Sequence, residues 1–251
     1  MLSGGVSINR VSFRYGLDGP NTLDDVSITA RPGEFVAIVG PSGSGKSTLI
    51  RLLLGFETPQ TGAIYYDEQN LSDLDLAAVR RQIGVVLQHD RLAPGTLAEN
   101  IVGLSLLTEA DAWQATELVG IADEIRRLPR GMQTLVSEAD NAFSGGQLQR
   151  LILARAVATR PRILIFDEAT SALDNHTQAV VTRNLEQLRA TRIVIAHRLS
   201  TIKRADQIYV MAGGKVVQHG TYAELERVEG AFRELMRRQQ FEPNPLEEGE
   251  R

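Results

Sequence analysis

Cysteine is absent from the 251 residues, which excludes disulfides, thiolate metal sites and cysteine nucleophiles. Long apolar runs are also missing, since none approaches the roughly 18–20 residues that cross a bilayer. There is no excess of positive charge, because 27 Lys and Arg stand against 31 Asp and Glu. The resulting net charge of −4 argues against broad binding to nucleic-acid phosphates. The first residues show no apolar core of a secretory signal, so we expect a soluble chain that would serve a membrane through a partner or through a further segment outside this sequence.

Short apolar runs and period-two segments predict strands, and helical spacing predicts helices between them. The predicted strands are 6–14, 26–30, 34–39, 63–66, 83–87, 162–166, 192–196, 207–211 and 215–219. The predicted helices are 47–54, 109–119, 146–158, 177–188 and 231–240. The strand–helix–strand order across 162–196 predicts a parallel crossover, and the last two strands predict a hairpin around Ala212-Gly-Gly214.

Helical periodicity dominates between residues 89 and 160, where strand signals fade. We therefore expect a helical subdomain over 89–160, inserted into one α/β domain that spans residues 1–241. Residues 242–251 contain two prolines and four glutamates, a composition that predicts a mobile tail.

A glycine-rich segment, Gly40-Pro-Ser-Gly-Ser-Gly-Lys-Ser-Thr48, follows one predicted strand and opens a predicted helix. A phosphate loop requires this context, whereas a flexible turn does not. Glycines let backbone N–H groups turn toward phosphate oxygens, Lys46 supplies charge near the β- and γ-phosphates, and the Ser47 hydroxyl suits Mg²⁺. The predicted nucleotide-binding residues of this loop are Gly40, Pro41, Ser42, Gly43, Ser44, Gly45, Lys46, Ser47 and Thr48.

An acidic pair ends the apolar segment Ile163-Leu-Ile-Phe-Asp-Glu168. Asp167 emerges at the carboxyl end of the predicted strand, where ligands bind in open α/β sheets. We expect Asp167 to hold Mg²⁺ through water and Glu168 to polarise an attacking water. The alternative, a solvated acidic pair at a strand end, is disfavoured by the phosphate loop.

A second glycine-rich segment, Phe143-Ser-Gly-Gly-Gln147, precedes that strand. Ser144 can cap the following helix, and Gly145 and Gly146 allow a phosphate to approach the backbone closely. Together these segments resemble the nucleotide-binding domain of ATP-binding cassette (ABC) proteins, over about residues 6–240. The family's signature motif usually has Leu at the position of Phe143. The resemblance implies that Phe143–Gln147 contacts the γ-phosphate held by the phosphate loop of a second copy.

Four further positions take their roles from the resemblance. Gln88 resembles the glutamine that contacts Mg²⁺ and water, and His197 resembles the histidine that contacts the γ-phosphate. Tyr15 resembles the aromatic residue that stacks on adenine, and Asp174 closes Ser171-Ala-Leu-Asp174, which resembles the loop along the dimer interface. Without the family context, a polar strand end, a structural histidine and a packing aromatic would explain the first three. The catalytic residues implied are Glu168, His197, Lys46 and Gln88, and the metal ligands are Ser47, Gln88 and Asp167.

The segment Leu92–Ile101 resembles the exporter branch, in which it faces the membrane domain. Ser137-Glu138-Ala139-Asp140 stands where exporters often have Gly-Glu-Arg-Gly. With Gly84-Val-Val-Leu-Gln88, this pattern is most similar to ATPases that export bacteriocin-type peptides. An ABC importer ATPase and a soluble ABC ATPase not coupled to transport are the alternatives.

The resemblance implies an α/β fold with a P-loop NTPase core, a mainly parallel sheet, an N-terminal antiparallel β subdomain and the helical insertion. It implies ATP and Mg²⁺, and an ATP-dependent head-to-tail homodimer, because all motifs are intact. It also implies a transmembrane domain, which we expect on the same longer polypeptide at the cytoplasmic face of the inner membrane. A separate ATPase subunit is the alternative, and no nucleic-acid partner is expected.

Overall fold

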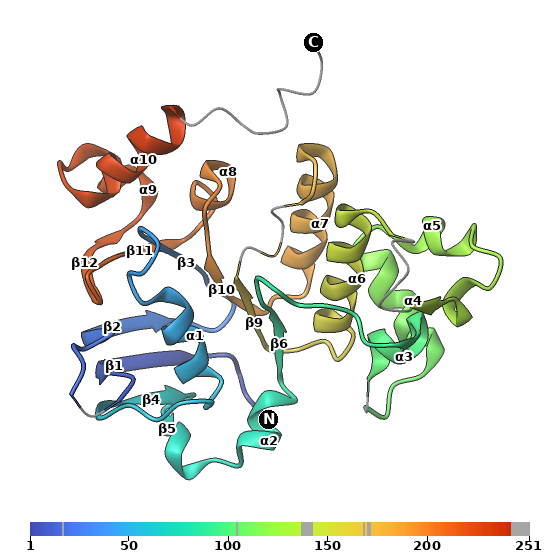
Figure 1. Ribbon diagram of the computed structural model, residues 1–251, viewed down its shortest axis with the longest axis horizontal. Helices are drawn as coiled ribbons and strands as arrows, with labels where there is room; N and C mark the ends of the chain where they lie inside the picture. The colour runs from blue at the N-terminus through green and yellow to red at the C-terminus, as the bar shows by residue number, and fades with distance from the viewer. Residues whose placement is uncertain (17, 104, 137–142, 168, 170–171, 242–251) are drawn as a thin grey trace. The chain divides into compact units, whose positions relative to one another are not determined.

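The computed structural model describes residues 1–16, 18–103, 105–136, 143–167, 169 and 172–241 (Figure 1). The chain forms two compact units, each assembled from several stretches of sequence. Unit 1 comprises Met1–Val6, Ala30–Glu34 and Tyr65–Val194. Unit 2 comprises Ser7–Thr29, Phe35–Ile64 and the described part of Ile195–Arg251. Both contain strands and helices, as the sequence predicted.

Unit 2 holds the phosphate loop between a buried strand and a helix. Its elements are β1 (Val6–Phe13), β2 (Leu23–Ala30), β3 (Phe35–Val39), α1 (Lys46–Leu53), β4 (Thr61–Tyr66), α8 (Leu199–Ile202), β11 (Gln207–Ala212), β12 (Lys215–Gly220), α9 (Tyr222–Arg227) and α10 (Ala231–Phe241). Every residue of β3 is buried, as expected for an apolar strand covered on both faces. β11 pairs parallel to β3 and antiparallel to β12, which confirms the predicted hairpin.

The N-terminal strands of unit 2 follow the predicted period of two. β1 alternates buried and more exposed residues at both of its ends, so one face packs inward. β2 begins at Leu23, three residues before the predicted start. The Asp24 N–H donates to the Gly214 carbonyl (2.8 Å), and the Tyr209 hydroxyl bonds both the N–H and the carbonyl of Thr29 (3.1 and 3.2 Å). Of these bonds, the one from Asp24 to Gly214 lies in the part of β2 that precedes its apolar run and supports the early start of the strand.

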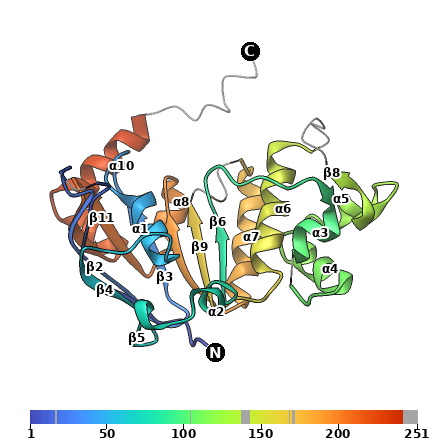
Figure 2. The same cartoon turned by 60° about the horizontal axis from the view of Figure 1, so that its bottom comes forward.

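Unit 1 contains most of the helices. Its elements are β5 (Gln69–Asn70), η1 (Leu71–Asp73), α2 (Leu76–Arg80), β6 (Ile83–Val86), β7 (Gly95–Thr96), α3 (Leu97–Val102), α4 (Glu109–Leu118), α5 (Ala122–Arg126), η2 (Gly131–Gln133), β8 (Leu135–Val136), α6 (Gly145–Val157), β9 (Ile163–Asp167), α7 (Asn175–Gln187) and β10 (Thr191–Ile195). β9 lies between β6 and β10 and pairs parallel to β6. Figure 2 shows this strand pair beside α6 and α7.

Short-range capping explains why the helices of unit 1 begin where they do. Capping boxes start α3 at Thr96, α4 at Thr108 and α6 at Ser144, and each satisfies backbone N–H groups of the first turn. The region 89–160 is mainly helical, as predicted, but it also contains the pairing of β7 with β8. Two-residue strands are too short to show a period, so the sequence pattern did not indicate this pairing.

None of the helices described is both long and apolar enough to cross a bilayer. The division into a domain at 1–241 with an inserted subdomain at 89–160 stays a prediction. The predicted tail at 242–251 lies outside the described residues.

Candidate nucleotide site

The phosphate loop follows β3 and has a backbone that only glycine can adopt at two positions. Gly40 has φ +153, and a Cβ atom built there would lie 2.1 Å from the Met211 carbonyl oxygen. Gly45 has φ +97, and its Cβ would lie 2.6 Å from the Leu23 side chain. Gly43, at φ +76, faces open space. The loop is therefore packed against unit 2 on one side and open on the other, a shape that fits a phosphate group.

Lys46 is the central cation of this loop. Its side chain is buried, and the ammonium donates to the carbonyl oxygens of Gly40 and Pro41, both at 2.8 Å. Ser44 and Thr48 are buried beside it, whereas Ser47 is exposed in the first turn of α1. α1 starts at a left-handed Gly45 with no side-chain cap. The loop thus holds a positive charge in the position that a phosphate site requires, and Pro41 and Ser42 lie exposed at its rim.

Tyr15 and His197 lie in the same unit. The Tyr15 hydroxyl donates to the Thr48 hydroxyl at 3.3 Å, and the ring packs edge-on against Phe13 at 4.8 Å while staying 51% exposed. An exposed ring tied to the helix of the phosphate loop fits a stacking role for adenine. The Ala196 N–H donates to the Ile38 carbonyl at 3.1 Å, which fixes exposed His197 next to the end of β3.

Gln88 and Asp167 come together in unit 1. β6 and β9 are parallel with Val86 opposite Phe166. Gln88 follows the end of β6 and Asp167 is the last residue of β9, so both lie at the carboxyl ends of neighbouring strands. Asp167 is buried and Gln88 is exposed.

The predicted Mg²⁺ ligands are Ser47 in unit 2 and these two residues in unit 1. The described parts of the chain contain no group of three or more His, Asp or Glu able to hold a metal. By their chemistry, a hydroxyl, an amide and a carboxylate are oxygen donors of the kind Mg²⁺ binds, and this ion uses few protein ligands and keeps waters and substrate phosphates. The predicted catalytic residue Glu168 lies outside the described residues.

The segment Phe143–Gln147, called here the signature segment, starts α6. The Ser144 hydroxyl accepts the Gln147 N–H at 3.2 Å, and the Gln147 side-chain oxygen accepts the Ser144 N–H at 2.8 Å. Gly145 and Gly146 form the first helical turn, and Phe143 is half-buried. This confirms that Ser144 caps α6, and the segment presents a helix N-terminus of the kind that binds anions.

Sequence reasoning missed Glu124, which forms a hydrogen bond with the Gln147 side chain of this segment. Glu124 of α5 accepts hydrogen bonds from Gln147 and from Arg150, each at 2.7 Å. The spacing of Gln147 and Arg150 places both on one face of α6, but their shared partner lies over twenty residues away and no local pattern marks it.

Asp174 caps α7 by accepting the Thr177 N–H at 2.9 Å. Hydrogen bonds from the Thr177 side chain and backbone hold the pKa of this exposed carboxyl below its usual range. The Gln149 side chain of α6 accepts the Ala172 N–H at 2.9 Å. Asp174 is therefore tied to the helix that begins with the signature segment. Ser171, the first residue of its predicted loop, lies outside the described residues, as do Ser137–Asp140.

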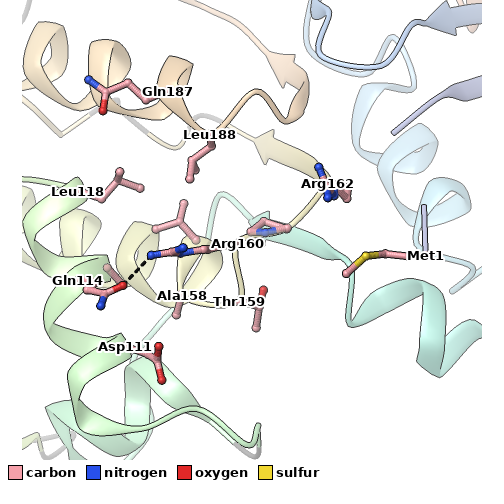
Figure 3. A pocket seen from close by; sticks show the side chains of 13 residues that line it. Met1, Asp111, Gln114, Leu118, Ala158, Thr159, Arg160, Arg162, Gln187 and Leu188 are labelled. Atoms are coloured by element: carbon pink, nitrogen blue, oxygen red, sulfur yellow. Dashed lines mark hydrogen bonds between the residues drawn. The ribbon is translucent and has the colours of Figure 1, made fainter. Parts of the chain in front are cut away.

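A cavity of about 600 Å³ in unit 1 contains none of the predicted site residues. Figure 3 shows Arg160 at its centre, where the guanidinium donates to Gln114 at 2.7 Å. The cavity lies where α6 and α7 end, and Arg160 and Arg162 are among its lining residues.

Comparisons with known proteins identify relatives that bind ATP or transport molecules, as their names state. A family model described as "ABC transporter" matches residues 23–171. The chain is 43% identical over 239 residues to the exotoxin translocation ATP-binding protein PaxB of Pasteurella aerogenes, covering 92% of this chain and 33% of that protein. It is 44% identical over 240 residues to the ATP-dependent lipid A-core flippase of Burkholderia pseudomallei, covering 94% of this chain and 40% of the flippase.

A solved structure of a bacterial Atm1-family ABC exporter with ATP bound superposes with a TM-score of 0.91 at 38% identity. The match covers 96% of this chain and 42% of the exporter chain. The chain thus spans between a third and two fifths of the length of the curated relatives. The predicted α/β fold of ABC ATPases is confirmed, and the chain belongs to the ABC transporter family.

Proposed function

We propose that this chain is the ATP-binding and ATP-hydrolysing domain of an ABC exporter. The observation that carries the proposal is the phosphate loop, in which a buried Lys46 lies inside a turn that only glycines can form. Family membership supports the role of ATP. The names of the relatives, a translocation protein, a flippase and an exporter, support outward transport.

In this proposal each site residue either positions the nucleotide and the attacking water or stabilises charge, which are the two requirements of phosphoryl transfer. Tyr15 stacks on adenine, and the loop Gly40–Thr48 holds the phosphates. Glu168 orients the attacking water, and His197 stabilises charge that develops on the γ-phosphate. Lys46 neutralises the β- and γ-phosphates throughout.

Mg²⁺, when bound, neutralises phosphate charge and favours in-line attack. Ser47, Gln88 and Asp167 would hold it, and their hydroxyl, amide and carboxylate oxygens are the hard donors that this ion prefers. The buried Asp167 supplies the only negative charge of this set.

A second copy of the chain completes each site in our proposal. The signature segment of one copy contacts the γ-phosphate in the phosphate loop of the other, and Asp174 lies along the interface. Two nucleotides sandwiched head to tail then make the dimer dependent on ATP, and hydrolysis releases it.

The membrane-facing partner in this proposal is a transmembrane domain on the same polypeptide, at the cytoplasmic face of the cell membrane. We propose a peptide or other hydrophobic cargo. The name of the toxin-translocating relative supports it, although a flippase is equally similar. Stimulation of ATPase activity in the complete transporter by peptide, compared with lipid A core, tests this choice. Stimulation by the lipid alone would overturn the peptide cargo.

Complementation tests the shared site directly. Lys46→Ala disables the phosphate loop and Ser144→Arg blocks the signature segment, so each variant alone should hydrolyse ATP at least about 100-fold more slowly than the unmodified chain. An equimolar mixture forms heterodimers with one intact composite site, and phosphate release should return to about a quarter of the unmodified rate. Full activity of Ser144→Arg alone would refute the shared site.

A separate variant tests the role of Glu168. Glu168→Gln should still bind ATP and accumulate as a dimer, because the water that attacks ATP is no longer oriented.

A further inference from the structure

We propose that Glu124 is a positioning residue for the signature segment, acting through Gln147. This rests on the proposed function, because it assigns the part of the site that would meet the second copy's nucleotide. Glu124 belongs to α5, and the sequence analysis did not single it out. Its role follows from how its two carboxylate oxygens are used.

The carboxylate joins two side chains of α6. Glu124 Oε2 accepts from Gln147 Nε2 and Glu124 Oε1 accepts from Arg150 Nη1, both at 2.7 Å. The Arg150 side chain is 12% exposed and that of Glu124 is 35% exposed. Burial raises the pKa of Glu124, but the hydrogen bonds from Arg150 and Gln147 outweigh it and hold the pKa below its usual range. The carboxylate is therefore charged at neutral pH and bound on both oxygens.

These bonds determine which way the Gln147 amide points. Its oxygen accepts the Ser144 N–H at 2.8 Å while its nitrogen donates to Glu124. A flipped amide would set its NH₂ group against the Ser144 N–H and its oxygen against a carboxylate, which are two repulsive contacts. Glu124 thus selects the orientation that completes the capping box of α6.

The cap in turn decides which groups remain for an incoming phosphate. The Ser144 oxygen accepts the Gln147 N–H, and the Ser144 O–H remains able to donate to a phosphate oxygen. Within the described part of the chain, the N–H groups of Gly145 and Gly146 have no acceptor. Loss of Glu124 would free Gln147 to rotate and would loosen the first turn that presents these three donors.

Arg150 prevents the carboxylate from repelling the phosphate. Its guanidinium donates to Glu124 at 2.7 Å and to the Gly120 carbonyl at 2.8 Å, so the negative charge of Glu124 is paired with a cation. Glu124 can therefore orient Gln147 without adding uncompensated charge to an anion site.

The test measures ATP hydrolysis and ATP binding in the 251-residue chain. Glu124→Ala should lower kcat about 10-fold, the rate effect of 1.4 kcal/mol, and leave the Kd for ATP at the phosphate loop unchanged. Glu124→Gln keeps one acceptor oxygen and should lose about 3-fold, since one of the two donors still finds a partner. Glu117→Ala is the matched control, because Glu117 is a half-exposed partner of Arg126 in the same region, and its kcat should not change.

A double-mutant cycle separates positioning from a general structural role. If Glu124 acts through Gln147, adding Glu124→Gln to Gln147→Ala should lower kcat no further. Fully additive losses, or a wild-type kcat in both Glu124 variants, would overturn the proposal. Should Glu124→Ala fail to fold, Glu124→Gln and the cycle decide it.

A readout independent of catalysis distinguishes this inference from the proposed function. The side-chain amide of Gln147, observed by ¹⁵N NMR, should be ordered in the unmodified chain and rotationally averaged in Glu124→Ala. If the unmodified chain neither binds nor hydrolyses ATP, the proposed function fails, yet this resonance still tests the positioning. An equally ordered amide in Glu124→Ala and the unmodified chain would overturn it.

Discussion

A Cβ atom added to Gly40 in the phosphate loop would collide with the Met211 carbonyl at 2.1 Å, whereas one added to Gly145 in the signature segment would meet nothing closer than the Ala172 side chain at 3.7 Å. Gly40 also has a positive φ, and Gly145 does not. The fold of the chain itself therefore requires glycine in the phosphate loop. Among the described residues nothing obstructs a methyl group at Gly145, so we expect the fold to tolerate alanine there.

The two segments are also held in different ways. The phosphate loop depends on packing, with Gly45 pressed against Leu23 and Lys46 buried over loop carbonyls. The signature segment depends on side-chain hydrogen bonds, from the Ser144 cap to the Glu124 carboxylate behind it. Packing is indifferent to pH, whereas carboxylate bonds are not.

Of the substitutions that test this contrast, Gly40→Ala should have the largest effect on stability. The added methyl group must displace the Met211 backbone and adopt a strained φ, so we expect a loss of about 3 kcal/mol or more in the free energy of unfolding. Urea denaturation measures it, with Gly43→Ala as control, because that site has a positive φ but open space and should lose only about 1–2 kcal/mol. Equal losses in both variants would show that packing does not distinguish them.

Gly145→Ala should separate stability from activity. Alanine replaces glycine in a helical turn, so the free energy of unfolding should stay constant or rise by up to about 1 kcal/mol. ATP binding should also be unchanged. The methyl group would hinder a phosphate from reaching the N–H groups of the first turn, and ATPase activity should fall about 100-fold, as for the loss of one oxyanion donor.

Thermal unfolding and phosphate release on the same preparation check the Gly145→Ala variant. If the variant hydrolyses ATP normally, the glycines of the signature segment do not serve an external phosphate. If the variant is strongly destabilised, the fold requires glycine at position 145 as well, and Gly145 does not differ from Gly40 in this respect.

The smallest expected effect is the pH dependence of the stability that Asp174 contributes as the N-cap of α7. The pKa of Asp174 is lowered by its bonds to Thr177, so its stabilisation is full above the unfolded-state pKa near 4 and is lost as pH falls through the lower folded-state pKa. Asp174→Asn keeps a neutral cap. The difference in melting temperature between the two proteins should therefore shrink between about pH 5 and pH 3, whereas that for Gly43→Ala should stay level. A pH-independent difference for Asp174→Asn would contradict the charged cap.

Much of the fold was predictable because its signals are local. The strand–loop–helix order around Gly40–Thr48, the helix cap at Ser144 and the final hairpin depend on residues close together in sequence, and each was confirmed. The β7–β8 pairing and the early start of β2 were not predicted. Both depend on bonds between distant segments, such as Thr134 with Leu97 and Gly214 with Asp24.

For this protein the sequence by itself determined the family and most of the candidate site, because phosphate binding needs fixed residue types at fixed short spacings around strand and helix ends. Only the tertiary structure decided why Gly40 must be glycine and which residue holds the Gln147 side chain. The close approach of Gly40 to the Met211 carbonyl and the hydrogen bond that Gln147 donates to Glu124 join residues far apart in the chain. Such contacts follow from how the elements pack, and no local pattern encodes them.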